Sequence, residues 1–110
     1  MIKKRTDEIV EKFVKGIEAA GLKDSIEKMY LFGSRARGDE RPDSDYDILM
    51  VVQNPDMAFK DKIYDVVMDV LFETRRGISL KIFKTAEFMR LKRLRIPFMR
   101  NVLKEGVRIG

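Results

Sequence analysis

Hydrophobic residues in the first third of the chain follow a helical spacing and then a strand-like run. In residues 6–20 they recur every three or four positions between charged residues, which predicts an amphipathic helix. Gly21 suits the left-handed position just after the end of such a helix. Residues 23–28 are polar and predict a connector, whereas the apolar residues 29–32 before Gly33 predict a strand.

The middle of the chain contains two further strand-like segments with a helical pattern between them. Residues 48–52 are five consecutive apolar residues, which is typical of a strand buried on both faces. Residues 57–75 predict a helix, with Asp56 as its cap and Gly77 as its stop signal. Residues 78–83 alternate in part between apolar and polar and predict a third strand.

The last part of the chain predicts two short helices. Thr85 can cap a helix that runs to about Leu94, and Pro97 suits the first turn of a helix that ends at Gly106. This order of elements predicts an α/β (α+β) fold of two layers, in which a small sheet of three or four strands is backed by helices. Because no repeat, low-complexity tract or linker interrupts the pattern, residues 1–110 are expected to form a single domain.

The composition restricts the chemistry that such a domain can perform. The chain has no cysteine and no histidine, which excludes disulfides, thiolate metal clusters and the commonest general base. Catalysis would therefore depend on carboxylates, hydroxyls, Lys, Arg and hard metal ions. No apolar run approaches the roughly 20 residues needed to cross a bilayer, so we expect a cytoplasmic protein without a membrane partner. A charged fraction of 37% with little Asn and Gln is common in thermophile proteins.

Positive charge is concentrated near the end of the chain. Residues 84–108 carry eight basic and two acidic side chains, in a chain whose net charge is +5. Such a segment can be a solvated helix face, a contact for RNA phosphates or a contact for an acidic partner protein. The sequence leaves these alternatives open.

Two short motifs flank the turn between the first two predicted strands. Gly33 would let a phosphate group approach the backbone, and Ser34 adds a hydroxyl at the start of the turn. Asp45 and Asp47 lie two residues apart in a strand and therefore project from one face, where their charges repel. A divalent ion such as Mg²⁺ would relieve that repulsion. Each motif alone is more often an ordinary turn or a solvated loop, but together they indicate a phosphate and metal site.

The string GSRARGDERPDSDYDI, which contains both motifs, resembles the signature of the DNA-polymerase-β-like nucleotidyltransferase superfamily. Within that superfamily it is most similar to the minimal nucleotidyltransferases, small prokaryotic proteins often paired with a HEPN-domain partner as antitoxin and toxin. The resemblance implies the nucleotidyltransferase fold with its mixed sheet. It also implies an enzyme that transfers a nucleoside monophosphate, with ATP the expected donor, to a hydroxyl on a partner protein or an RNA.

The resemblance further implies roles for individual residues. Asp45 and Asp47 would be the catalytic pair and would bind two Mg²⁺ ions, which clamp the attacking and leaving oxygens. The positions that would bind the nucleotide are Gly33, Ser34, Arg35 and Arg37. The glycine and serine would hold phosphates, and the two arginines would neutralise the charge of the triphosphate. For either arginine, a solvated loop charge is the alternative.

One predicted strand departs from the family pattern. Active members usually carry a third carboxylate on the next strand, but residues 78–83 contain no acid, and Ser79 and Lys81 lie on the face where it is expected. The nearest acids, Asp65 and Asp69, are predicted to be exposed on a helix. Two interpretations stay open: a transferase that works with two carboxylates, and a non-catalytic, nucleotide-binding antitoxin that neutralises a HEPN-type ribonuclease by contact.

Overall fold

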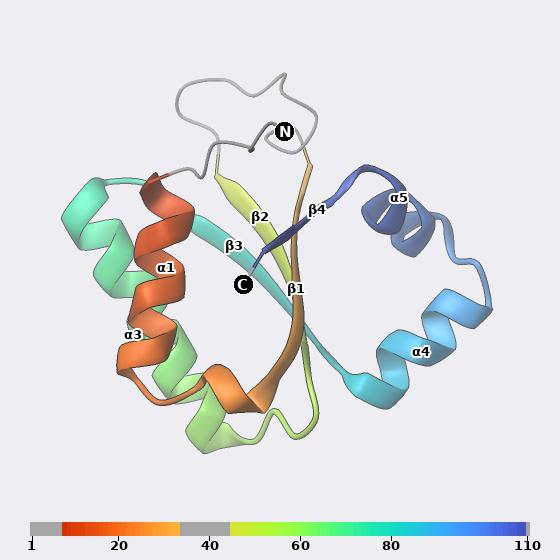
Figure 1. Ribbon diagram of the computed structural model, residues 1–110, viewed down its shortest axis with the longest axis horizontal. Coiled ribbons are helices and arrows are strands. Elements are labelled where there is room, and N and C mark those ends of the chain that lie inside the picture. The colour runs from red at the N-terminus through yellow and green to blue at the C-terminus, as the bar shows by residue number, and fades with distance from the viewer. Residues whose placement is uncertain (1–7, 34–44, 110) are drawn as a thin grey trace, which may run out of the picture.

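The computed structural model describes residues 8–33 and 45–109, which form a mixed sheet with helices on both faces (Figure 1). The sheet has four strands in the order β3-β2-β1-β4; β1 is antiparallel to β2 and to β4, whereas β2 and β3 are parallel. No helix in this part of the chain is both long enough and apolar enough to cross a bilayer. In chain order the elements are α1 (Glu8–Ala19), the 3-10 turn η1 (Lys23–Ser25), β1 (Ile26–Phe32), β2 (Tyr46–Val52), α3 (Met57–Thr74), β3 (Ile78–Lys84), α4 (Thr85–Arg93), α5 (Pro97–Glu105) and β4 (Val107–Ile109).

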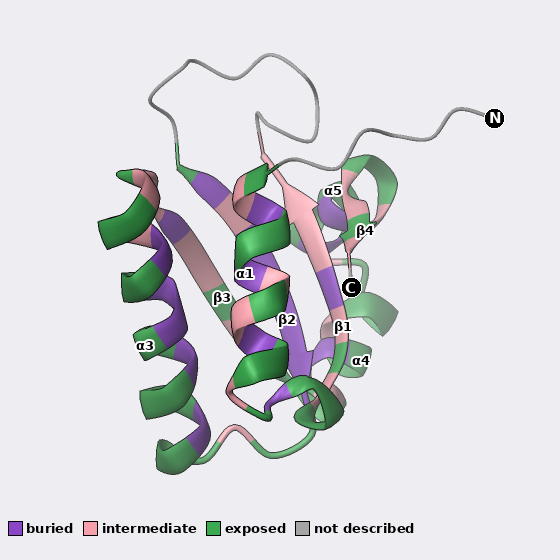
Figure 2. Ribbon diagram, turned by 60° about the vertical axis from the view of Figure 1, so that its left-hand side comes forward, coloured by how far each residue is buried: buried purple, intermediate pink, exposed green. Residues whose placement is uncertain are grey.

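The larger core lies between the sheet and the pair of helices α1 and α3 (Figure 2). Apolar residues of both helices meet alternate residues of β2 there, and the fully buried members include Phe13, Ile48, Met50 and Ile63. The two helices approach each other closely at Gly16, where an added Cβ would lie only 2.7 Å from Cγ1 of Val66. The apolar residues that recur every three or four positions in α1 and α3 are therefore the residues that pack against one face of the sheet.

A second core lies on the opposite face of the sheet, under α4 and α5 (Figure 1). Leu49 and Val51 of β2 pack there with Phe88, Met99 and Val102. The prediction that residues 48–52 are buried on both faces is therefore confirmed. The expectation of two layers is wrong for the same reason, since a strand that is apolar on both faces needs helices on each side of the sheet.

The start of α3 agrees with the sequence, but its end does not. Asp56 caps the helix, because its side chain accepts a hydrogen bond of 2.9 Å from the Phe59 amide. The helix ends at Thr74, and Arg75, not Gly77, adopts the left-handed conformation with φ of 64°. The prediction that Gly77 stops this helix is therefore wrong.

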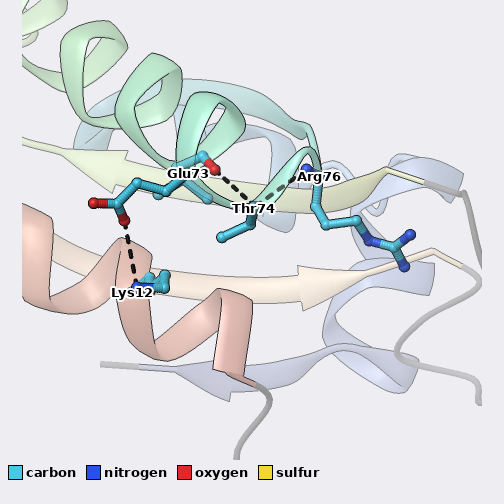
Figure 3. A network of polar contacts seen from close by, with 5 residues as sticks. Lys12, Glu73, Thr74 and Arg76 are labelled. Atoms are coloured by element: carbon cyan, nitrogen blue, oxygen red, sulfur yellow. Dashed lines mark hydrogen bonds and ion pairs between the residues drawn. The ribbon is translucent and has the colours of Figure 1, made fainter.

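A small polar network holds the end of α3 in place (Figure 3). The Thr74 hydroxyl donates a 2.7 Å hydrogen bond to the Val70 carbonyl and accepts one of 3.1 Å from the Arg76 amide. Lys12 of α1 lies 3.3 Å from the carboxylate of Glu73. The hydrogen bonds of Thr74 join the last turn of α3 to the residues that lead to β3, whereas the Lys12–Glu73 pair is exposed and adds little.

The ends of three further elements differ from the sequence prediction. Strand β1 starts at Ile26, within the segment predicted to be a connector, and the short strand β4 is not among the predicted elements. Helix α4 is capped by Lys84, whose amide donates to the Glu87 carboxylate at 3.4 Å, so that Thr85 is the first helical residue and not the cap. Both unexpected strand segments pair with neighbours in the sheet, and such tertiary pairing is not visible in the local pattern.

Candidate active site

Asp45 and Asp47 lie at the N-terminal end of β2, on the face of the sheet that α4 and α5 cover further along. Asp47 is paired across the sheet with Phe32 of β1 and with Ser79 of β3. Tyr46, between the two aspartates, is 3% exposed and belongs to the core under α1 and α3. Because neighbouring residues of a strand project to opposite faces, the two carboxylates share the other face.

Gly33 follows β1 directly and makes room for one of these carboxylates. It has a φ of 79°, a conformation that glycine adopts at little cost. A Cβ at this position would collide with Oδ2 of Asp47 and would lie 3.3 Å from its Cγ. The Gly33 backbone therefore lies close to the Asp47 carboxylate, and the contact of Gly33 with a phosphate stays a prediction.

Gly77, just before β3, has the same relation to the other carboxylate. A Cβ there would lie 3.1 Å from Oδ1 of Asp45, and the Gly77 carbonyl accepts a 3.0 Å hydrogen bond from the Tyr46 amide. The sequence interpretation assigned this glycine only a role in ending α3. The order of a strand, a helix and a second strand is the sequence signal that could have placed Gly77 near Asp45. Strands joined through a helix usually pair in parallel, and parallel strands begin at the same edge of a sheet.

The other predicted nucleotide ligands lie in the segment that follows Gly33. Ser34, Arg35 and Arg37 fall outside the described residues, so their roles stay predictions. The described chain leaves β1 at Gly33 and re-enters the sheet at Asp45, so both ends of this segment adjoin the carboxylate pair.

Burial and neighbouring charges act on the Asp47 carboxylate in opposite directions. Burial raises the pKa of Asp47 above its ordinary value of 3.8, the Lys81 ammonium lowers the pKa, and the Asp45 carboxylate raises it. The net shift of the pKa is upward. An ionised Asp47 is therefore less stable in the folded protein than in water, which is a condition that a bound cation would relieve.

This electrostatic cost gives a testable pH dependence of stability. A carboxyl group whose pKa is raised on folding binds more protons in the folded state, so that its contribution to stability is present below pH 3.8 and is lost as pH rises through the folded pKa. In EDTA, the melting temperature of the D47N variant should therefore exceed that of the wild type at pH 7, and the difference should shrink toward pH 3.8. Melting curves followed by circular dichroism between pH 3 and 8 measure this.

The control for that experiment is the divalent ion itself. Excess Mg²⁺ at pH 7 should raise the melting temperature of the wild type more than that of D47N, since binding to the folded state stabilises it. A variant that is less stable than the wild type in EDTA at pH 7 would show that the ionised Asp47 carboxylate makes net favourable contacts, which would contradict an electrostatic cost of its burial.

The donors at this site fit a divalent ion that prefers oxygen. Two carboxylates on one face, each backed by a glycine, offer oxygen ligands of the kind that Mg²⁺ favours, with further positions left for water and phosphate. Within residues 8–33 and 45–109 no group of three or more acids is placed to hold a metal. Mg²⁺ would thus be held by Asp45 and Asp47 and would supply charge neutralisation at the phosphates.

Comparison with known proteins bears on the family and the fold of the chain. Residues 15–110 match the family model described as polymerase beta, nucleotidyltransferase. In a solved structure described as a toxin–antitoxin with AMP-PNP, one chain has the same fold, with a TM-score of 0.60 and 17% identity, over 90% of this chain and 70% of that one.

Two proteins of Methanocaldococcus jannaschii are similar over almost their whole length. MJ0604 is 33% identical over 100 residues, covering 91% of this chain and 93% of its own. MJ0141 is 33% identical over 103 residues, covering 93% and 96%. Both are named as candidate protein adenylyltransferases. The family match, which extends from α1 to the last strand, and the carboxylate pair at the start of β2 lead to one conclusion: the chain belongs to the polymerase β-like nucleotidyltransferase family.

Proposed function

We propose that the protein transfers AMP from ATP, bound together with Mg²⁺, to a hydroxyl group on a partner protein. The observation that carries this proposal is the placement of Asp45 and Asp47 on one face at the start of β2, against the glycine that ends β1. The names of the two M. jannaschii relatives support adenylyl as the group and protein as the acceptor. The fold likeness to a protein crystallised with AMP-PNP is consistent with an ATP-like donor.

In the proposed reaction the acceptor oxygen forms a bond to the α-phosphorus while the bond from that phosphorus to the bridging oxygen breaks. Pyrophosphate leaves, and the proton of the hydroxyl is released to solvent. Asp45 and Asp47 would hold the donor through its metal ion, Gly33 and Ser34 would bind its phosphates, and Arg35 and Arg37 would neutralise triphosphate charge. The protein thus acts mainly by positioning the donor and stabilising developing charge.

The acceptor would approach from the side of α4 and α5. These helices cover the face of the sheet that also carries Asp47, and they expose Arg90, Lys92, Arg93 and Arg100 to solvent. Exposed basic side chains favour a partner with an acidic surface and increase the rate of encounter with it. A HEPN-domain protein is the partner that we propose, and RNA phosphates are the alternative target for the same charges.

A second candidate function follows from the lysine on β3. Lys81, and not an acid, lies on the face of β3 that adjoins Asp47. A site with two carboxylates can still bind Mg²⁺ and ATP while turning over slowly or not at all. The protein would then be an antitoxin that binds nucleotide and inhibits a HEPN-type ribonuclease by contact.

A labelling experiment separates the two candidates. The purified protein is incubated with Mg²⁺ and a HEPN-domain protein from a neighbouring gene, in parallel with α-labelled and γ-labelled ATP. Transfer of AMP should place label on the partner from α-labelled ATP only, and the labelled product should be sensitive to protease and resistant to ribonuclease. Ribonuclease-sensitive label would make RNA the acceptor. An unlabelled partner that is bound and inhibited would sink the enzyme proposal and support the antitoxin.

A further inference from the structure

Lys81 is a basic residue of β3 that lies near Asp47 of the neighbouring strand β2. In the parallel pair of β2 and β3, Asp47 is opposite Ser79, and Leu49 is opposite Lys81. Residues paired across neighbouring strands share a face, and Phe83, two residues further along β3, belongs to the core under α4 and α5 with Leu49. The side chains of Lys81 and Asp47 therefore project from the same face of the sheet.

The distance between these positions suits a lysine. Neighbouring strands lie about 4.8 Å apart and a strand rises about 3.3 Å per residue, so the Cα atoms of Asp47 and Lys81 are roughly 8 Å apart. The flexible four-carbon stem of lysine can span most of that gap and carry the ammonium toward the carboxylates. The effect of the Lys81 ammonium on the pKa of Asp47 agrees with such an approach. Lys81 itself is exposed, so its side chain is free to turn toward a ligand.

A positive charge near Asp47 competes with a metal ion for that carboxylate. Two-metal sites hold their ions about 3.5–4 Å apart, and carboxylates around and between the ions offset the repulsion between them. In this site the described residues provide Asp45 and Asp47 but no third acid in the group, and on β3 Ser79 is opposite Asp47, with the cation Lys81 two residues further along. A second divalent ion would therefore lack a third carboxylate ligand, and the like charge of the Lys81 ammonium would repel it.

We propose that the ε-ammonium of Lys81 takes the place of a second divalent cation, so that the site binds one Mg²⁺ per nucleotide and Lys81 contacts the nucleotide phosphates directly. This inference rests on the proposed function, because it assumes that Asp45 and Asp47 hold a metal–nucleotide complex. It concerns the number of ions bound, and it can therefore be tested without any acceptor.

The experiment counts Mn²⁺ in place of Mg²⁺, by the electron paramagnetic resonance signal of the free ion, with AMP-PNP equimolar to a protein concentration well above the dissociation constant, so that no unbound nucleotide chelates the ion. The wild type should bind one Mn²⁺ per AMP-PNP. The K81D variant supplies a third carboxylate and should bind two. The K81M variant, which lacks the charge but adds no ligand, should bind one and should bind AMP-PNP about tenfold more weakly, since a charge-assisted contact to phosphate is lost.

The control for net charge is Lys60→Asp, a variant with the same change of charge on the exposed surface of α3. It should keep one Mn²⁺ and the wild-type affinity for AMP-PNP. If K81D does not fold, as judged by circular dichroism, Lys81→Glu takes its place with the same expectation.

The outcomes are distinct. Two Mn²⁺ ions on the wild type would overturn the inference while supporting the proposed nucleotide site. A single ion on K81D or on its glutamate equivalent would also overturn it, because Lys81 would then not be what excludes the second ion. A wild type that binds neither AMP-PNP nor Mn²⁺ would contradict the proposed function itself, and this inference with it.

Discussion

Replacing Asp45 or Asp47 with asparagine should lower the rate of AMP transfer by roughly 10³-fold or more. An amide keeps the size of the side chain but removes the charge that holds the metal ion, and metal ions contribute several kcal/mol of charge stabilisation in such reactions. The loss should appear in the turnover rate and also in the binding of ATP with Mg²⁺. Initial rates with α-labelled ATP and calorimetric titration with ATP and Mg²⁺ measure the two effects.

Asp65→Asn and Asp69→Asn are the matched controls for this prediction. Both aspartates are exposed on α3, as the sequence predicted, and α3 covers the face of the sheet opposite to the carboxylate pair. Their variants should transfer AMP at the wild-type rate. Binding of ATP with Mg²⁺ that survives the loss of both Asp45 and Asp47 would show that the metal site is elsewhere in the protein.

Replacing Gly33 with alanine should weaken binding of ATP with Mg²⁺ by about 100-fold or more, with only a moderate loss of stability. The added Cβ would collide with Oδ2 of Asp47, so this carboxylate would have to move. A loss of about 100-fold lies at the upper end of the roughly 10–100-fold loss of metal affinity that follows when a residue that positions a metal ligand is changed. The left-handed backbone adds roughly 1–2 kcal/mol of strain for any residue with a Cβ. Denaturant unfolding and calorimetry separate the two contributions.

Gly21→Ala provides a control with nearly the same backbone. Gly21 has a φ of 74°, compared with 79° at Gly33, but a Cβ there would have no atom within 4 Å. This variant should lose a similar amount of stability, roughly 1–2 kcal/mol, and bind ATP with Mg²⁺ as the wild type does. Equal binding by the two alanine variants would mean that the contact between Gly33 and Asp47 has no role in the site.

Local chemistry made several features of this protein predictable from sequence. Asp56 caps α3 because a carboxylate one position before a helix accepts an amide hydrogen bond wherever the helix packs. The apolar run at residues 48–52 is a strand buried on both faces because no polar face is present to be solvated. The two-residue spacing of Asp45 and Asp47 predicted that both side chains lie on one face of the strand, because the alternation of side chains along a strand depends on the backbone alone.

Contacts that depend on strand register were not predictable in the same way. Gly77 was interpreted as a helix stop, but its contact with Asp45 exists only because β3 pairs in parallel with β2 at one particular register. The left-handed conformation at Arg75, where glycine is usual, had no sequence signal. Strand β4 has three residues and forms by pairing with β1, so the local pattern could not identify it.

The position of β2 has a consequence for how the site responds to a ligand. This strand is paired on both sides and covered on both faces, so the backbone that carries Asp47 belongs to the part of the fold that opens most rarely. Asp47 is therefore preorganised, and little backbone entropy is lost at this residue when a metal–nucleotide complex binds. Substitutions that loosen the core beneath β2 should make Asp47 less well ordered before binding. They should then reduce the affinity for the metal–nucleotide complex, even where the substituted residue does not contact it.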